Sequence, residues 1–331
     1  MLTIKKLIMV LSGLTVLLAG TFILGLALGA VSIPIAQGIF GAGLDPTSRT
    51  ILLDLRLPRV LLAGIVGWSL SLGGVVFQAL MRNPLAEPFL LGISSGAALG
   101  AVAGIILGVL FWGGIPMLAF LGALITITLV LAIAQKARTI DPNTLILTGV
   151  IINAFFASLI MVALATTAGE KLHSMLFWLY GDLSRGRFQD FLFLVPVIGG
   201  CSAVLYGLGR SFNLIAAGEE TASQLGLEVE RIKWLSLILV SLMCGVTVAF
   251  SGVIGFVGLI VPHLVRMAFG ADHRLLLPAS GLFGASFMIG ADLLARTVIS
   301  PSELPVGVIT AFLGAPFFLH LLYLRRRQWI L

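Results

Sequence analysis

The chain has 331 residues, of which 59% are apolar and only 10% are charged, and its formal net charge is +6. Soluble domains average about 45–50% apolar and about 25% charged residues, so this composition excludes a water-soluble globule and a disordered chain. A membrane-spanning helix needs about 20 mostly apolar residues, and the sequence has room for about eight to ten of them. The composition therefore predicts an all-α, polytopic membrane protein.

The first apolar run follows Lys5 and Lys6 and begins at Leu7. It is longer than the core of a signal peptide, which has about 7–15 residues, so we expect it to be retained as a membrane span. The expected spans are 7–31, 59–81, 90–109, 115–135, 143–168, 190–209, 233–254, 256–269, 277–297 and 305–324. The eighth is too short to cross as a straight helix. We expect one transmembrane domain over residues 1–331.

The 20 Lys and Arg residues predict the orientation of the chain. With the N-terminus inside, 13 of them fall on the cytoplasmic side and 7 on the outer side, as Lys and Arg prefer cytoplasmic loops. Ten spans then place both termini in the cytoplasm. Because loops of this kind explain the net positive charge, no nucleic-acid partner is expected.

Small residues recur at helical spacing in the second span, at Gly64, Gly67, Ser71 and Gly74. Small faces let helices approach closely in lipid, so the pattern predicts a tightly packed bundle. The two cysteines, Cys201 and Cys244, lie inside apolar runs, which gives neither a disulfide framework nor a metal cluster.

Several catalytic and energy-coupling motifs are missing from the sequence. It has no G-x-x-x-x-G-K-[ST] phosphate loop, no H-E-x-x-H and no G-x-S-x-G, so we expect no enzyme activity, no bound cofactor and no metal site. Asp292 is the one acidic residue within an expected span, and Arg296 lies one turn away at i,i+4, which predicts a local ion pair. Ion-coupled transporters keep ionisable groups at mid-membrane depth, so a secondary transporter is disfavoured.

The longest polar stretch on the cytoplasmic side runs from Arg210 to Lys233. Its Ala-rich part, from Ala216 to Gly226, predicts a short surface helix that Gly226 ends with a sharp turn. Such a helix can seat in a cleft of a soluble partner, although an ordinary amphipathic connector has the same pattern. The candidate coupling residues are Ala217, Gly218, Glu219, Glu220, Ala222, Gln224, Leu225 and Gly226.

Three further segments occur in a characteristic order. They are Arg56-Leu57-Pro58-Arg59 with Asn83-Pro84-Leu85-Ala86-Glu87-Pro88 and Leu91-Gly92-Ile93-Ser94-Ser95-Gly96; the run from Ser251 to Arg266; and Glu303-Leu304-Pro305-Val306-Gly307 followed by Gly314-Ala315-Pro316-Phe317. From about residue 50 to 324 the chain resembles the permease subunits of ABC importers for ferric siderophores, haem and cobalamin. In the coupling stretch, Glu220, Ala222 and Gly226 fit a loosened form of the docking motif of ABC-importer permeases, with Thr221 where that motif has Ala.

This resemblance implies a ten-helix permease in the cytoplasmic (inner) membrane that pairs with a second copy of itself. Two copies of a separate ATPase would bind coupling helices at about residues 212–230, and a periplasmic or lipid-anchored solute-binding protein would deliver the solute. It also implies that Arg56, Arg59 and Arg296 meet glutamates of that binding protein. Arg56 and Arg59 flank Pro58, which is favourable at a helix start, so we expect them to project from the outer mouth of the second span. Anchoring to lipid phosphates is the alternative.

Two other polar groups have weaker assignments. Asp141, Pro142 and Asn143 join the fourth and fifth spans and are candidates for a cytoplasmic gate. His263 precedes Arg266 by one turn, but no second ligand lies nearby in the sequence, so we expect a structural histidine.

The substrate expected first is an iron chelate, a ferric siderophore or haem. Phe177-Trp178 followed by Gly181-Asp182-Leu183-Ser184 looks more like the iron-chelate members than the cobalamin members. Cobalamin transport within the same family is the alternative, followed by a secondary transporter and an intramembrane enzyme.

Overall fold

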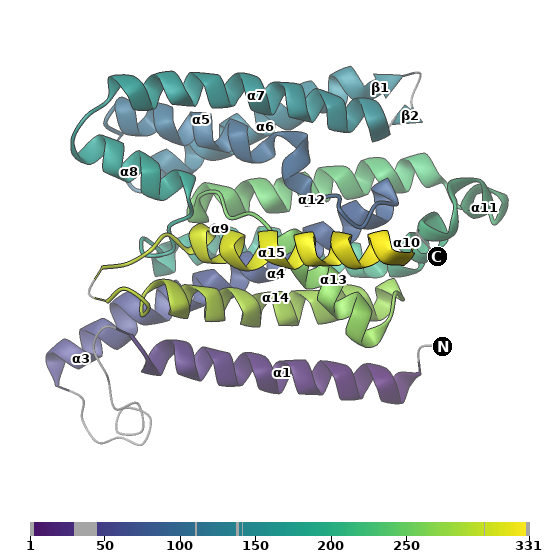
Figure 1. Ribbon diagram of the computed structural model, residues 1–331, viewed down its shortest axis with the longest axis horizontal. Helices are drawn as coiled ribbons and strands as arrows, with labels where there is room; N and C mark the ends of the chain where they lie inside the picture. Colours follow the sequence, from purple (N-terminus) through teal and green to yellow (C-terminus); the bar gives the residue numbers. More distant parts are fainter. Residues whose placement is uncertain are drawn as a thin grey trace.

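Nearly parallel helices form a bundle in the computed structural model, which describes residues 3–29, 45–109, 111–136, 139–140, 142–300 and 302–328. Both chain termini lie at one end of the bundle together with α10 and α11, and α3 and α8 lie at the opposite end (Figure 1). We call these the α11 end and the α3 end. The predicted all-α class is confirmed.

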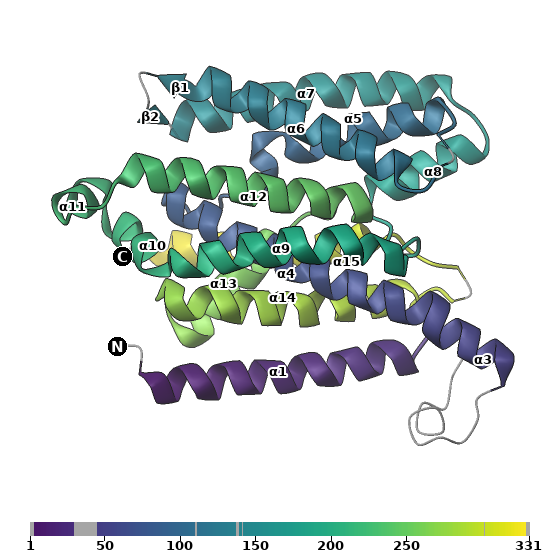
Figure 2. The same cartoon turned by 180° about the vertical axis from the view of Figure 1, so that it is seen from behind.

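The first half of the chain runs from one side of the bundle, through its centre, to the other side (Figures 1 and 2). Its elements are α1 (Ile4–Ala27), α3 (Pro46–Thr50), a π-helical turn (Ile51–Arg56), α4 (Leu57–Met81), a 3-10 turn (Pro88–Leu91), α5 (Ile93–Ile106), α6 (Gly114–Ala134), the strands β1 (Gln135–Lys136) and β2 (Thr139–Ile140), and α7 (Pro142–Thr166). The two strands pair in an antiparallel register, with Gln135 opposite Ile140.

The second half packs helices against α4 and then returns to the α11 end. Its elements are α8 (Glu170–Leu179), a 3-10 turn (Phe188–Asp190), α9 (Phe191–Gly207), α10 (Gly209–Ala217), α11 (Glu219–Gln224), α12 (Val229–Ser251), α13 (Val257–Phe269), α14 (His273–Ala295) and α15 (Val306–Gln328).

Apolar helices occur at all ten of the expected spans. Among the described residues, seven helices are long and apolar enough to cross a membrane, and three shorter apolar helices cover Ile93–Ile106, Val257–Phe269 and Val306–Leu321. The short eighth span of the sequence corresponds to α13. The number of membrane crossings itself stays a prediction.

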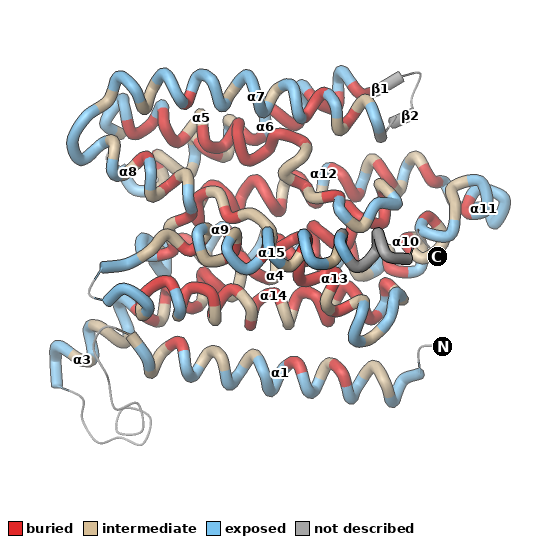
Figure 3. Tube along the Cα trace, in the orientation of Figure 1, coloured by how far each residue is buried: buried red, intermediate tan, exposed pale blue. Residues whose placement is uncertain are grey.

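Helix α4 lies at the centre of the bundle and packs against α9, α10, α12, α13 and α14. In both views α5, α6 and α7 lie on one side of this core and α1 on the other (Figures 1 and 2). Buried residues concentrate on α4, α12 and α14, whereas α1 and α7 are largely exposed (Figure 3). This distribution fits a protein whose outer helices face hydrocarbon rather than water.

Two glycines of α4 let neighbouring backbones approach closely. A Cβ atom built on Gly67 would overlap the carbonyl oxygen of Gly284 in α14, and one built on Gly74 would overlap that of Gly258 in α13. The small-residue spacing therefore predicts the packing of α4 correctly.

We expect Gly67→Ala to lower the thermal unfolding midpoint of the detergent-solubilised protein, because overpacking costs about 1–3 kcal/mol. The control is Gly64→Ala, one turn earlier, where the new Cβ would lie 3.6 Å from Ile289 Cδ1. Alanine is the better helix former, so this second change should be neutral or stabilising. Equal thermal unfolding midpoints for the two variants would contradict the close approach of α4 to α14 at Gly67.

Pro58 is the second residue of α4, near the start of the helix as the sequence predicts, but the helical run does not begin there. The helical run starts at Pro46 and continues to Met81. Immediately before Pro58 the chain forms a π-turn, in which the Leu57 N–H donates to the Leu52 carbonyl, five residues earlier. Proline lacks an N–H and normally breaks a helix; the wider turn accommodates it within a continuous one.

The joint after α4 folds back along the helix instead of staying at its end. Pro88 lies beside Gly73, about two turns before the last residue of α4, with its Cγ 3.5 Å from a Cβ built there. The carboxylate of Glu87 accepts a hydrogen bond from the backbone N–H of Phe256, at the start of α13. The sequence places Glu87 in a joint, but the structure brings its carboxyl group into the bundle, so that Glu87 is an interior acid in addition to Asp292.

Candidate functional sites at the two ends of the bundle

Ion pairs join α4, α14 and the segment before α15 at the α3 end. Arg59 Nε lies 2.9 Å from Asp292 Oδ1, and Arg59 Nη1 lies 2.7 Å from Glu303 Oε2. Arg296 Nε lies 3.5 Å from Asp292 Oδ2, so the predicted i,i+4 pair is confirmed. Asp292 is only 1% exposed. A carboxylate buried to this degree needs such partners, because an unpaired buried charge is strongly unfavourable.

Two of the arginines also bind the end of α1. Arg56 Nη1 donates to the carbonyl oxygens of Leu26 and Ala27 at 2.9 and 3.0 Å, and Arg296 Nη2 donates to that of Gly25. The last carbonyls of a helix have no partner within it and carry the negative end of its dipole. The arginines therefore fasten α1 to α4 and α14.

The structure brings Arg56, Arg59 and Arg296 together but does not let them project. Their exposed fractions are 6%, 9% and 4%. The expectation of projecting side chains is wrong because carboxylates and helix-end carbonyls within the chain take up the guanidinium groups. All three still line an outward cavity of about 340 Å³, together with Ser184 and Glu303.

At the α11 end, two short helices stand where the sequence predicts one. Gly218, with φ +140°, separates α10 from α11, and Gly226, with φ +84°, makes the predicted turn after α11. Lys233 of α12 pairs with Glu219 at 2.5 Å and with Glu230 at 3.3 Å. With the buried Ala222, these pairs fix α11 on α12.

The remaining candidate coupling residues form a free surface at this end. Ala217, Glu220, Gln224, Leu225 and Gly226 are exposed, and Leu225 is 66% exposed although it is apolar. Helix α11 extends beyond the other helices of the bundle (Figure 1). An exposed apolar side chain directly after a surface helix is available to a partner that seats the helix in an apolar groove.

The comparisons with known proteins identify the family. The model of the FecCD transport family matches residues 16–324. The chain belongs to this family. A cobalamin import system permease, BtuC of Halobacterium salinarum, is 44% identical over 280 residues, which are 85% of this chain and 75% of that one. The haemin transport permease HmuU of Yersinia pestis is 40% identical, with 84% of each chain covered.

A solved structure agrees with the family assignment. It is described as an inward-facing conformation of a metal-chelate type ABC transporter, and its chain superposes with a TM-score of 0.84 at 36% identity. The match covers 95% of this chain and 98% of that one. The FecCD-family chain is thus a multi-pass permease of an ABC importer and not an enzyme.

The candidate gate of the permease lies at the start of α7. Pro142 begins this helix and Asn143 is exposed, whereas Asp141 lies outside the described residues. A gating role for these residues stays a prediction. His263 of α13 is buried, with its ring centroid 5.9 Å from that of Phe317 and 6.1 Å from that of Phe318. Within the described residues, no three His, Cys, Asp or Glu side chains are grouped to hold a metal ion.

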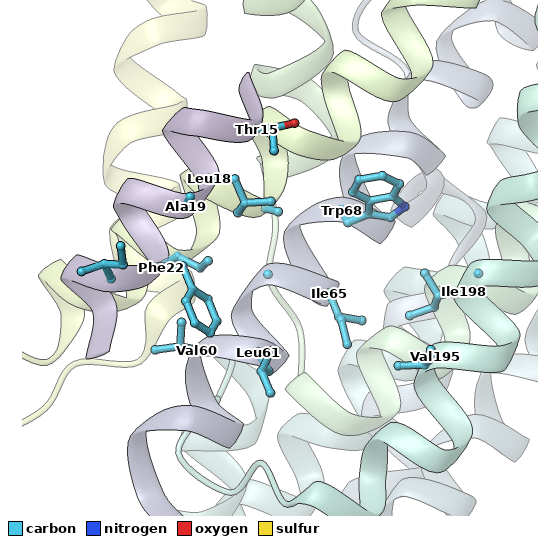
Figure 4. A pocket seen from close by; sticks show the side chains of 15 residues that line it. Thr15, Leu18, Ala19, Phe22, Val60, Leu61, Ile65, Trp68, Val195 and Ile198 are labelled. Carbon is cyan, nitrogen blue, oxygen red and sulfur yellow. The ribbon is translucent and has the colours of Figure 1, made fainter. Parts of the chain in front are cut away.

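An apolar groove of about 600 Å³ lies between α1, α4, α9 and α14 of the permease (Figure 4). Its described lining has no charged side chain, and its two polar groups are bonded within the protein. Thr15 Oγ1 donates to the Leu11 carbonyl, and Trp68 Nε1 donates to Ser202 Oγ at 3.1 Å. Such a lining matches the hydrocarbon of a bilayer and offers nothing to orient a polar solute.

Proposed function

We propose that this permease forms the membrane path of an inner-membrane importer that takes up an iron chelate, a ferric siderophore or haem. The observation that carries the proposal is that each end of the helix bundle has its own candidate docking site. The exposed α10–α11 pair at one end suits an ATPase, and the arginine cavity at the other suits a carboxylate-bearing delivery protein. The 40% identity to a haemin permease supports haem-like cargo. Cobalamin is the second candidate, because a cobalamin permease is 44% identical.

The assembly we propose contains two copies of this chain, two ATPase subunits and one external binding protein. The α11 end would face the cytoplasm, as the distribution of Lys and Arg in the sequence indicates. Both termini lie at that end of the bundle (Figure 1), in agreement with an even number of crossings.

The arginine cavity would receive carboxylates of the binding protein. Its described lining residues include three arginines and one carboxylate, that of Glu303, whereas Asp292 pairs with Arg59 and Arg296 beneath the cavity surface. The cluster therefore keeps an excess of positive charge toward the opening. Because internal contacts already hold the arginines, little side-chain entropy would be lost when a partner binds.

We expect Glu303→Gln to strengthen the association with the binding protein several-fold at low salt. The change removes the one carboxylate among the described lining residues of the cavity, and electrostatic complementarity mainly raises the association rate. Glu303 is half exposed, so the fold should persist. Surface plasmon resonance at two salt concentrations measures the effect, which screening should reduce.

Glu170→Gln is the control for this measurement, because Glu170 begins α8 at the same end, is exposed and does not line the cavity. If Glu303→Gln left association unchanged or weakened it at low salt while the control behaved like wild type, docking at the cavity would be refuted.

Uptake in proteoliposomes tests the proposed function. Liposomes that contain the permease and its ATPase, with ATP inside, receive the binding protein loaded with a ferric siderophore, haem or cobalamin. We expect uptake of an iron chelate that requires ATP and survives an uncoupler, because Asp292 is already paired with Arg59 and Arg296 and is not free to carry protons. Preferred uptake of cobalamin would reject the iron-chelate assignment. Loss of uptake with an uncoupler at constant ATP would favour a secondary transporter.

A further inference from the structure

A second polar cavity, of about 390 Å³, lies at the α11 end. It is bounded by the end of α4, by α10 and by the joint between α13 and α14, and its polar lining includes Arg82, Asn83, Asn213, Arg266 and His273. Ala216 and Ala217 of α10 also line it, so the cavity adjoins the candidate coupling surface. Its volume falls within the range of pockets that bind small molecules.

The charge in this cavity is positive and uncompensated. No acidic side chain is among its described lining residues, and within the described residues neither Arg82 nor Arg266 has a carboxylate at ion-pair distance. Arg266 Nη2 donates to the neutral Gln78 Oε1 at 3.0 Å.

Asp272 lies between two cavity-lining residues, Ala271 and His273, but its carboxylate is already paired. Asp272 accepts from Arg274 Nη2 at 2.6 Å and from Asn213 Nδ2 at 2.9 Å. The hydrogen bond from Arg274, followed by that from Asn213, lowers the pKa of Asp272, so this carboxylate stays ionised and paired. It therefore leaves the charges of Arg82 and Arg266 unbalanced.

Arg82 adopts a backbone conformation that its residue type rarely takes. It ends α4 in the left-handed region, with φ +47° and ψ +34°. Glycine or asparagine normally takes this position after a helix. An outlier of this kind is a reason to look for a function of the side chain, and here the side chain lines the cavity.

His273 adds an unsatisfied polar atom to the same wall. Its side chain is only 4% exposed. Nδ1 lies 2.8 Å from Asn213 Oδ1, which also accepts from the His273 backbone N–H, whereas Nε2 is buried without a hydrogen-bond partner. A neutral ring that donates from Nδ1 would accept at Nε2 from a phosphate hydroxyl, and a protonated ring would donate to a phosphate oxygen.

We propose that this cavity binds a phosphate-type oxyanion between the end of α4 and α10. Arg82 and Arg266 supply charge-assisted hydrogen bonds, which suit phosphate oxygens, and His273 completes its hydrogen bonding. The phosphate group belongs either to free inorganic phosphate or to the head group of an anionic lipid. Basic pockets between transmembrane helices on the cytoplasmic side bind such head groups, and the α11 end faces that side in the orientation proposed above. A bound anion would join α4 directly to the coupling helix.

The test uses the full-length permease in nanodiscs of phosphatidylcholine. Binding of radiolabelled inorganic phosphate is measured by equilibrium dialysis against chloride of equal ionic strength. We expect saturable binding that Arg82→Gln weakens by about tenfold, a loss equal to about 1.4 kcal/mol. Arg231→Gln is the matched control, because Arg231 is an exposed cation at the same end that pairs with Glu228 and does not line the cavity.

A second variant separates binding from folding. Arg82→Gly relieves the left-handed strain, so it should keep or raise the thermal unfolding midpoint and still lose phosphate affinity. A parallel experiment without free phosphate uses nanodiscs that contain phosphatidylglycerol. If the bound phosphate group comes from a lipid, this lipid should raise the thermal unfolding midpoint of the wild type more than it raises that of Arg82→Gly. Wild-type phosphate affinity in Arg82→Gly would overturn the proposal. So would the finding that neither phosphate nor phosphatidylglycerol has an effect on the wild-type permease beyond that of chloride.

Discussion

Leu225→Glu should abolish ATP-driven uptake and release the ATPase while the permease stays folded in the membrane. Leu225 directly follows α11 and is 66% exposed, so a charged side chain there disturbs little of the permease itself. In a partner's cleft the same charge would be buried without a counter-ion. Co-purification of the ATPase and uptake in proteoliposomes measure the two effects, and we expect each to fall by more than tenfold.

Leu225→Met is the control for this variant, because it keeps an apolar anchor and should retain both activities. Normal co-purification and uptake with Leu225→Glu would show that this surface is an ordinary connector.

Gly226→Val probes the same surface through the backbone. At φ +84° a β-branched residue is strained even though no atom lies within 4 Å of its Cβ. The turn after α11 should shift and coupling should fall, whereas Gly226→Asn should retain coupling because asparagine tolerates the left-handed region. Equal coupling in both variants would contradict the role of this turn.

The sequence predicts the helices well because their signal is local. Each expected span is a contiguous apolar run, and seven helices of the described residues meet the length and hydropathy of a span. The turn at Gly226 and the pair of Asp292 with Arg296 are also local, since each depends on residues within one turn. Pro58 does lie near the start of α4, but the helical run that precedes it is not predicted, because the π-turn before Pro58 depends on tertiary context.

The side-chain contacts that build the candidate site at the α3 end and bring Glu87 into the bundle could not be predicted from the sequence in the same way. Arg59 and Asp292 are separated by 233 positions in the chain, so no spacing rule links them. The burial of Arg56 depends on where α1 ends, and the return of Glu87 into the bundle depends on the space beside Gly73. Hydropathy indicates which segments enter the membrane, but it contains no information about which helix ends meet.

The buried ion pairs at the α3 end give the largest expected effect on stability. Arg59→Met would leave the carboxylate of Asp292, which is 1% exposed, with only Arg296 at 3.5 Å. Removing one partner of a buried pair costs about 3–5 kcal/mol, because the other charge stays buried. We therefore expect a large fall in the free energy of unfolding, measured by equilibrium denaturation in mixed micelles. Asp292→Asn should also destabilise the protein, since it leaves Arg59 and Arg296 facing each other.

The double variant Arg59→Met with Asp292→Asn separates this explanation from simple loss of packing. Replacing both members of a buried pair by neutral groups of similar size is often nearly neutral, so the double variant should recover most of the stability that each single variant loses. Arg231→Gln provides the control, because its pair with Glu228 is exposed and such surface pairs contribute little. If the losses of the two single variants simply added in the double variant, Arg59 and Asp292 would act independently.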